Sequence, residues 1–162
     1  MKIEASRKII QPIDVSSVVI DLKAQGKRVV SLNGSFDLMH AGHLYMLYEA
    51  KKKGDILIVA LNSDKSIKQY KNSNRPIIPL EFRLLMMAAI EVVDYVTFFD
   101  ETVPMEILKK IHPDIHVNGA EYGKECVESD LLKDLGSDLY LVDRIPSLST
   151  SEIINKIKAL CD

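Results

Sequence analysis

The stretch from residue 28 to residue 54 constrains the fold and function of this chain more than any other. It opens with Arg28–Leu32, a short β-branched and apolar run that is typical of a strand. Then come the turn Asn33-Gly34-Ser35-Phe36-Asp37, the motif His40-Ala41-Gly42-His43, and a leucine- and alanine-rich run that is predicted to be a helix ending at Gly54. The sequence therefore predicts a strand that turns into a helix, with two histidines where that helix begins.

The two histidines are suited to an anion. A helix N-terminus leaves backbone N–H groups unpaired and carries partial positive charge. His40 and His43 are three residues apart and lie on one face of the first turn. Gly42 between them lets an anion approach the backbone. A single histidine here is more often a cap or a surface residue, but this pair favours a phosphate site. A metal is not expected, because no third ligand lies at a suitable spacing.

Composition limits the class of protein. The chain has 162 residues, 47% of them hydrophobic and 27% charged, with a net charge of −2. These values predict one globular domain over residues 1–162, with a helical lead-in over 1–27 and no nucleic-acid partner. Apolar runs such as 56–61 are too short to span a membrane, and there is no signal-peptide core, so a cytoplasmic location is expected. Cys126 and Cys161 are expected to be free thiols.

Strands and helices alternate along the whole chain. Strands are predicted at 28–33, 55–61, 94–98, 114–118 and 138–142, and helices at 15–25, 64–68, 80–91, 103–111, within 120–136, and from about 150 to 159. This alternation predicts a doubly wound, parallel α/β sheet with a Rossmann-like fold. Ligands of such sheets bind beyond the carboxyl ends of the strands, where the loops that follow them are expected to converge.

Other polar residues extend the predicted anion site. Ser149 and Thr150 place hydroxyls at the start of the last helix, although they could be a plain helix cap. Lys71 and Arg75 lie in the irregular stretch 69–79, where Lys71 could also be a surface charge. Arg83 lies near a helix start, where its charge opposes the helix dipole, so it is expected to serve another purpose. Neither a P-loop nor a Gly-x-Gly-x-x-Gly motif is present.

The Gly34-Ser35-Phe36-Asp37 turn followed by His40-Ala41-Gly42-His43 resembles the hallmark of the cytidylyltransferase-like nucleotidyltransferase superfamily. Within it, the chain is most similar to the adenylyltransferase domain of bacterial heptose-phosphate enzymes, which make ADP-heptose for the lipopolysaccharide core. The resemblance covers nearly the whole chain. Further matching positions include Asn62-Ser63-Asp64, Lys71, Arg75-Pro76, Pro79-Leu80-Glu81, Arg83, Pro113-Asp114, Gly119, Tyr122 and Leu148-Ser149-Thr150.

The resemblance implies roles for individual residues. His40, His43 and Arg83 would bind or activate phosphates, Lys71 would assist, and Ser149 and Thr150 would hold the β- and γ-phosphates. The other expected nucleotide-binding residues are Asn33, Gly34, Ser35, Phe36, Asp37, Gly42, Asn62, Asp64, Arg75, Asn118, Gly119, Glu121, Tyr122, Arg144 and Leu148. The resemblance also implies ATP as a substrate, Mg²⁺ as a cofactor and a homodimer.

The predicted reaction transfers AMP from ATP to a sugar 1-phosphate, D-glycero-D-manno-heptose 1-phosphate, and releases pyrophosphate. The acceptor phosphate is already anionic at pH 7, so positioning and charge stabilisation suffice. The main alternative is a CTP-dependent enzyme acting on glycerol 3-phosphate. Arg144 favours it, and Asn118-Gly119-Ala120-Glu121-Tyr122 departs from the family's usual Lys-Gly-Gly-Asp-Tyr. A non-catalytic nucleotide sensor is a second alternative, and any sugar kinase is expected to be a separate protein.

Overall fold

Five parallel strands form the sheet at the centre of the molecule, in the order β3-β2-β1-β4-β5. The computed structural model describes residues 4–71, 73–143 and 149–161. The strands are β1 Val29–Gly34, β2 Ile56–Asn62, β3 Tyr95–Phe99, β4 Ile115–Gly119 and β5 Asp138–Val142. Each of the first four begins one residue later than predicted, and the predicted doubly wound parallel α/β fold is confirmed.

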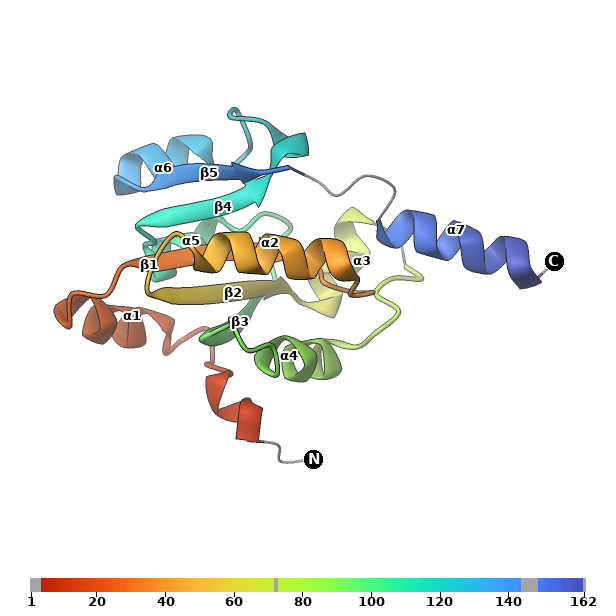
Figure 1. Cartoon of the computed structure of the whole chain (residues 1–162), viewed down its shortest axis with the longest axis horizontal. Helices are drawn as coiled ribbons and strands as arrows, with labels where there is room; N and C mark the ends of the chain where they lie inside the picture. The colour runs from red at the N-terminus through yellow and green to blue at the C-terminus, as the bar shows by residue number, and fades with distance from the viewer. Residues whose placement is uncertain (1–3, 72, 144–148, 162) are drawn as a thin grey trace.

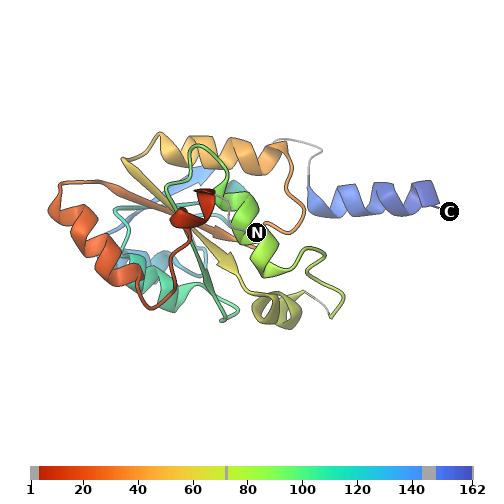
Figure 2. The ribbon, with the colours of Figure 1, turned by 90° about the horizontal axis from the view of Figure 1, so that it is seen from below.

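Helices cover both faces of the sheet. The helices are η1 Glu4–Lys8, α1 Val15–Ala24, α2 Ala41–Lys51, α3 Asp64–Tyr70, α4 Leu80–Ala88, α5 Met105–Ile111, η2 Ala120–Tyr122, α6 Ser129–Leu135 and α7 Thr150–Cys161. Figure 2 shows α2 on one side of the strands and α1 and α5 on the other. In both views α7 projects away from the sheet (Figure 1, Figure 2). None of the described helices is both long and apolar enough to cross a membrane.

Alternate side chains of each strand enter different apolar clusters. Val30 and Leu32 of β1 pack in the cluster that contains Leu47 of α2, together with residues of α4. Val29 faces the other way and packs in the cluster that contains Ile111 of α5, together with residues of α1. All five side chains are buried. Burying an aliphatic side chain stabilises the fold by roughly 1.5–3 kcal/mol, so these two clusters fix β1 between the helix layers.

The order in which the chain adds strands to the sheet reverses at β1. This strand pairs with β2 on one side and with β4 on the other, so that Leu32 lies opposite both Val59 and Val117. The connection after β1 runs through α2 on one face, while the connection into β4 runs through α5 on the other face. Loops part at such a switch point and leave a crevice beyond the carboxyl ends of the strands. The fold therefore places the loops after β1, β2 and β4 around one opening.

Three local details differ from the sequence predictions. Helix α2 ends with Lys52 as its C-cap, and Gly54 lies beyond it, where an added Cβ would be 2.8 Å from the carbonyl oxygen of Arg28. Asp14 precedes α1, but its side chain makes no capping hydrogen bond. In the lead-in, Ile9 forms a parallel bridge with Val96. Cys126 is a free thiol, and the side chain of Cys161 lies outside what the structure describes.

Candidate active site

A cavity of about 610 Å³ opens at the carboxyl ends of β1, β2 and β4. This volume is within the range of small-molecule sites. Most of the predicted site residues line it: Asn33, Gly34, Ser35, Phe36, Asp37, His40, Gly42, His43, Asn62, Lys71, Asn118, Glu121, Tyr122, Ser149 and Thr150. Residues from positions 33 to 151 thus meet in one place, as the predicted convergence of loops requires.

The turn after β1 has an unusual backbone. Phe36 adopts φ 45°, a left-handed conformation that is uncommon for a non-glycine residue. Its buried ring packs against the ring of His43, with 5.1 Å between centroids. Gly34 accommodates this ring, because an added Cβ at Gly34 would lie 3.1 Å from it. The Gly-Ser-Phe turn therefore supports the ring of His43 through the ring of Phe36.

The two histidines are stacked at the start of α2. Their ring centroids are 3.9 Å apart, and His40 occupies the N-cap position. The backbone N–H of His40 donates to Nδ1 of His43 over 3.3 Å. Because Nδ1 accepts this bond, the neutral ring of His43 carries its proton on Nε2. His43 is thus prepared to donate a hydrogen bond to an anion at the positive end of α2.

Lys71 brings a positive charge to the same cavity. Its Nζ lies 2.9 Å from Oγ of Ser35, which also accepts a hydrogen bond from the hydroxyl of Tyr70 over 3.3 Å. Lys71 is an exposed residue, but the surrounding protein partly desolvates its ammonium; this desolvation and the nearby charge of Arg75 lower the pKa of Lys71 from its ordinary value. The negative charge of a bound phosphate would offset both effects, so the surroundings of Lys71 favour an anion.

The structure corrects the role predicted for Arg83. Its side chain is 0% exposed, and Arg83 is not among the described residues that line the cavity. The guanidinium donates instead to three backbone carbonyls and one carboxylate, those of Ser35 (2.6 Å), Asn62 (2.8 Å), Ile78 (2.9 Å) and Asp64 (2.7 Å). Arg83 is therefore a positioning residue that ties the ends of β1 and β2 to α3 and to the loop before α4.

Arg75 and Asp37 form a second internal tie. The Asp37 carboxylate is buried, lies 2.7 Å from Nε of Arg75, and accepts hydrogen bonds from the backbone N–H groups of Ile77 and Ile78. Its oxygens are thus occupied by the 75–78 segment, and Arg75 is not among the described residues that line the cavity. Both residues hold the loop that presents Lys71, rather than a ligand.

The start of α7 closes another side of the cavity. Oγ of Ser149 accepts a hydrogen bond from the backbone N–H of Glu152 and so caps α7, while the Thr150 hydroxyl donates to the carbonyl oxygen of Leu38. Both line the cavity. Of the other predicted residues, Asp64 and Gly119 are not among the described residues that line it, and Arg144 and Leu148 lie outside the described residues.

The sequence did not reveal several cavity residues. These are Met46, Tyr70, Thr102, Val103, Pro104, Val127, Glu128 and Ser151. Most come from loops or a helix start that carry no recognisable motif, while Met46 lies within α2 and Tyr70 at the end of α3. Adjacency to a predicted residue could have suggested Tyr70 and Ser151, which flank Lys71 and Thr150. Val127 and Glu128 face the cavity only because the segment after β4 folds back over it.

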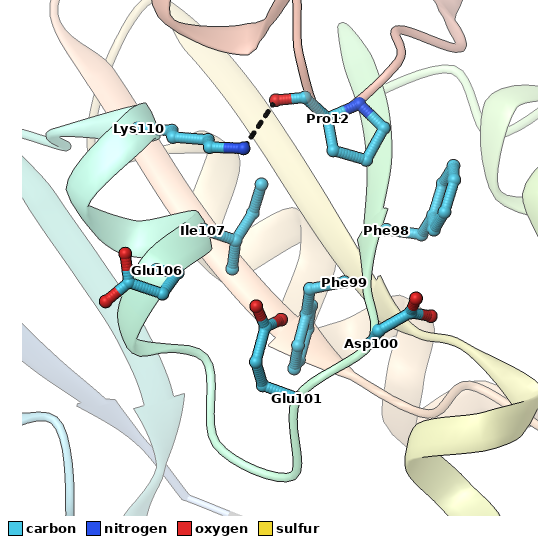
Figure 3. Close-up of a pocket in the computed structure, with 8 residues that line it drawn as sticks. All are labelled: Pro12, Phe98, Phe99, Asp100, Glu101, Glu106, Ile107 and Lys110. Carbon is cyan, nitrogen blue, oxygen red and sulfur yellow. Dashed lines mark hydrogen bonds between the residues drawn. The ribbon is translucent and has the colours of Figure 1, made fainter.

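A second pocket, of about 160 Å³, lies beyond the end of β3 and is unsuited to phosphate. Figure 3 shows carboxylates of Asp100, Glu101 and Glu106 around it, while the ammonium of Lys110 is directed to the carbonyl oxygen of Pro12. These negative charges would repel an anion. The larger cavity is therefore the candidate active site.

Comparison with known proteins agrees with this geometry. The chain is 42% identical to the bifunctional protein HldE of Nitratiruptor sp., over 90% of this chain and 31% of that protein. It is 48% identical to HldE of Campylobacter curvus, over 82% of this chain and 28% of that protein. The chain thus spans about a third of the length of these curated relatives.

Two solved structures are also similar to this chain. In the crystal structure of the lipopolysaccharide core biosynthesis protein from Thermoplasma volcanium, the matched sequence is 30% identical and the TM-score is 0.60. The match covers 74% of this chain and 98% of that one. Pantoate-beta-alanine ligase from Francisella tularensis is similar in fold alone, with 17% identity, a TM-score of 0.65, and 95% and 79% coverage. The family described as cytidylyltransferase-like matches residues 31–156, which include the histidine pair, Lys71 and the start of α7, and the chain belongs to that family.

Proposed function

We propose that this protein transfers AMP from ATP to a sugar 1-phosphate and releases pyrophosphate. One observation carries the proposal: the stacked His40 and His43 at the positive end of α2 share a cavity with Lys71. Donors and a cation from separate elements are thus directed at one volume. This arrangement suits a triphosphate, and the chain's membership of a nucleotidyltransferase family supports it.

The reaction needs charge stabilisation more than proton transfer. An oxygen of the acceptor phosphate attacks the α-phosphorus, and the bond from that phosphorus to the oxygen bridging it to the β-phosphate breaks. Negative charge grows on the departing pyrophosphate. Nε2–H of His43 and the ammonium of Lys71 would stabilise that charge, and such donors are each worth roughly 10²–10³ in rate. Ser149 and Thr150, on the α7 side, would hold the β- and γ-phosphates.

The β4 side of the cavity would take the nucleoside. Its lining includes two carboxylates, those of Glu121 and Glu128, beside Asn118 and Tyr122. Carboxylates repel phosphates, so the uncharged base belongs here and the triphosphate at the histidine and lysine side. This orientation lays ATP across the end of β1, between the two walls of the cavity.

Mg²⁺ would arrive with the triphosphate as part of the substrate. The described residues contain no cluster of three or more His, Cys, Asp or Glu side chains able to hold a metal by themselves. Mg²⁺ typically keeps several waters and binds substrate phosphates with few protein ligands, so this donor set fits a substrate-borne ion. When bound, the ion would neutralise charge on the phosphates that His43 and Lys71 contact.

We take D-glycero-D-manno-heptose 1-phosphate as the acceptor. The support is the resemblance of the chain to heptose-phosphate adenylyltransferase domains and its identity to HldE proteins. Those relatives are named bifunctional, and this chain matches about a third of their length, so only that part of them supports the proposal. A cytoplasmic location is proposed, because ATP and sugar phosphates are found there.

We also propose a homodimer. On α7, the side chains of Ile157 and Leu160 are 51% and 77% exposed. A second copy could cover these apolar groups, which projecting helices rarely leave in water. Analytical ultracentrifugation tests this directly: a dimer that Leu160→Asp dissociates is expected, and a monomeric wild type at micromolar concentration would contradict it.

The function itself is tested by pyrophosphate release. Wild-type protein with MgATP and the heptose 1-phosphate is expected to release pyrophosphate and to form an ADP-sugar detectable by mass spectrometry. CTP and glycerol 3-phosphate are the comparison substrates. A higher kcat/KM with CTP would replace the proposed reaction by a cytidylyl transfer, and nucleotide binding without turnover for any acceptor would indicate a sensor.

A further inference from the structure

One carboxylate on the β4 side of the cavity is buried without a complete set of partners. Glu128 is 5% exposed, and its Oε2 has no hydrogen-bond partner among the described residues. Glu128 is the N-cap residue of α6, yet its side chain accepts no hydrogen bond from that helix. A buried carboxylate oxygen without a donor is unfavourable, so a donor from a ligand would stabilise it.

The neighbours of Glu128 define the ligand group that it could accept. Glu128, Asn118 and Val127 all line the cavity. Oδ1 of Asn118 accepts the backbone N–H of Gly119 over 3.0 Å, so the remaining polar group of that side chain is its NH₂, whose two hydrogens allow it to bond a ligand as well as its neighbour Cys126. Burial, and then a hydrogen bond to Glu128, raise the pKa of Cys126, which keeps this thiol neutral. The wall thus offers a carboxylate acceptor and an amide donor next to an apolar surface.

This pair of groups matches one edge of adenine. The Watson–Crick edge of adenine carries an amine donor at C6 next to the acceptor N1. Rotation of the Glu128 carboxylate about its last torsion exchanges its two oxygens and brings either one to the cavity. We infer that Glu128 selects the base, by accepting a hydrogen bond from the exocyclic amine of the nucleotide. The inference rests on the proposed function, since it requires a nucleotide with its base on the β4 side.

Nucleotides that differ at the Watson–Crick edge of the base test this role without an acceptor sugar. ATP carries an amine at C6, and purine riboside triphosphate carries hydrogen there. ITP carries a carbonyl, whose partial negative charge would face the carboxylate, and an N–H in place of the acceptor N1, which would face the amide donor of Asn118. Dissociation constants of the Mg²⁺ complexes are measured by calorimetry. The wild type is expected to bind ATP about 10–100 times more tightly than ITP, with purine riboside triphosphate between them.

Glu128→Gln removes the negative charge and adds a donor that can pair with the carbonyl of ITP. We expect the ATP-to-ITP ratio to fall to about threefold or less. Glu125→Gln is the matched control, because it removes the same charge from an exposed position in the same segment that is not among the described residues lining the cavity. It should leave the ratio at the wild-type value.

The outcomes separate the two proposals. If the wild type binds ATP and ITP equally, or if Glu128→Gln retains the wild-type ratio, then the role of Glu128 is wrong while the proposed function stands. If no nucleoside triphosphate binds, both fail. The wild-type comparison does not depend on any variant, so a poorly folded Glu128→Gln protein would not remove the test.

Discussion

The two walls of the cavity are built differently. The wall after β1 and β2 is tied together by Arg83, which joins four separate segments, and by Asp37, which holds the 75–78 backbone. The wall after β4 consists of the short helix η2 and the segment before α6, and its Glu128 carboxylate lacks a full set of partners among the described residues. The first wall is rigid and cationic, and the second is acidic and less constrained.

This difference corresponds to what each wall would bind. The triphosphate is common to all nucleotides, so the groups that hold it can be fixed by internal hydrogen bonds. The base differs between nucleotides, and the wall that would read it carries Glu128, whose Oε2 lacks a hydrogen-bond partner among the described residues. A rigid half that binds the charged phosphates and a selective half that reads the base would explain why, among the described residues that line the cavity, Lys71 lies on the first wall and the carboxylates of Glu121 and Glu128 lie on the second.

The largest effect is expected at the rigid wall, from His43→Asn. The asparagine Oδ1 can replace Nδ1 as acceptor of the His40 N–H, but the variant lacks the Nε2 donor. We expect kcat to fall by roughly 10²–10³, with unchanged circular dichroism and nucleotide affinity within about tenfold. Turnover within threefold of the wild type would mean that this wall does not act on the triphosphate.

The second-largest effect is expected on stability, and it distinguishes Arg83, a positioning residue, from Lys71, which lines the cavity. Arg83→Met leaves buried carbonyl oxygens of Ser35 and Asn62 without their donor, so the free energy of unfolding should fall by about 3 kcal/mol. Lys71→Met is the matched control and should change it by less than about 0.5 kcal/mol, because Lys71 is exposed. Urea denaturation measures both, and equal losses would remove the distinction between the two residues.

The third prediction concerns β4, the strand that carries the selective wall. His116 is fully buried, which lowers its pKa to about 4 from 6.5, and its ring lies 2.7 Å from the Ser31 hydroxyl. Between those two pKa values the unfolded chain binds a proton that the folded protein excludes, so stability is full above pH 6.5 and declines as the pH falls toward 4. From pH 7.5 to pH 5 the loss should be about 2 kcal/mol.

His116→Gln tests this assignment. The variant is expected to be less stable at pH 7.5, but its stability should decline less steeply with acid, by the amount that His116 contributes. Denaturation curves at pH 7.5, 6 and 5 provide the comparison. A variant with the same pH dependence as the wild type would show that another group is responsible.

The smallest effect is expected at the start of α7. Ser149→Ala removes the hydroxyl that accepts the N–H of Glu152 and should destabilise α7 by about 1 kcal/mol. Because α7 projects from the sheet, the loss should be local: amide exchange in α7 about fivefold faster, with the melting temperature unchanged. A global loss of stability would indicate that α7 is part of the main folding unit.

The sequence predicted the fold well because its signals are local. Short apolar runs such as 56–61 are typical of buried parallel strands, and the alternation with helices leaves few topologies. The convergence of His40, Asn62 and Asn118 on one cavity was predictable for a related reason, because the carboxyl ends of parallel strands lie at the same edge of a sheet. Shifts of one residue at strand starts are within the usual uncertainty of such boundaries.

The roles of individual side chains were harder to predict. An arginine that binds a phosphate and one that binds backbone carbonyls look the same in sequence, and only the burial of Arg83 separates them. Glu128 and Tyr70 belong to no motif, and their approach to the cavity depends on how the chain folds back after β4 and α3. The partners of a side chain depend on tertiary packing, which periodicity does not encode.

The four-way anchorage by Arg83 has a consequence for how this protein can diversify. A substitution of Arg83 removes a support that residues 35, 62, 64 and 78 share, so changes at this one position are expected to be selected against. Substitutions should instead accumulate in the stretch from 118 to 128, where a replaced side chain breaks few contacts with other residues. Homologues with new nucleotide preferences would then keep the two histidines and differ in the wall after β4.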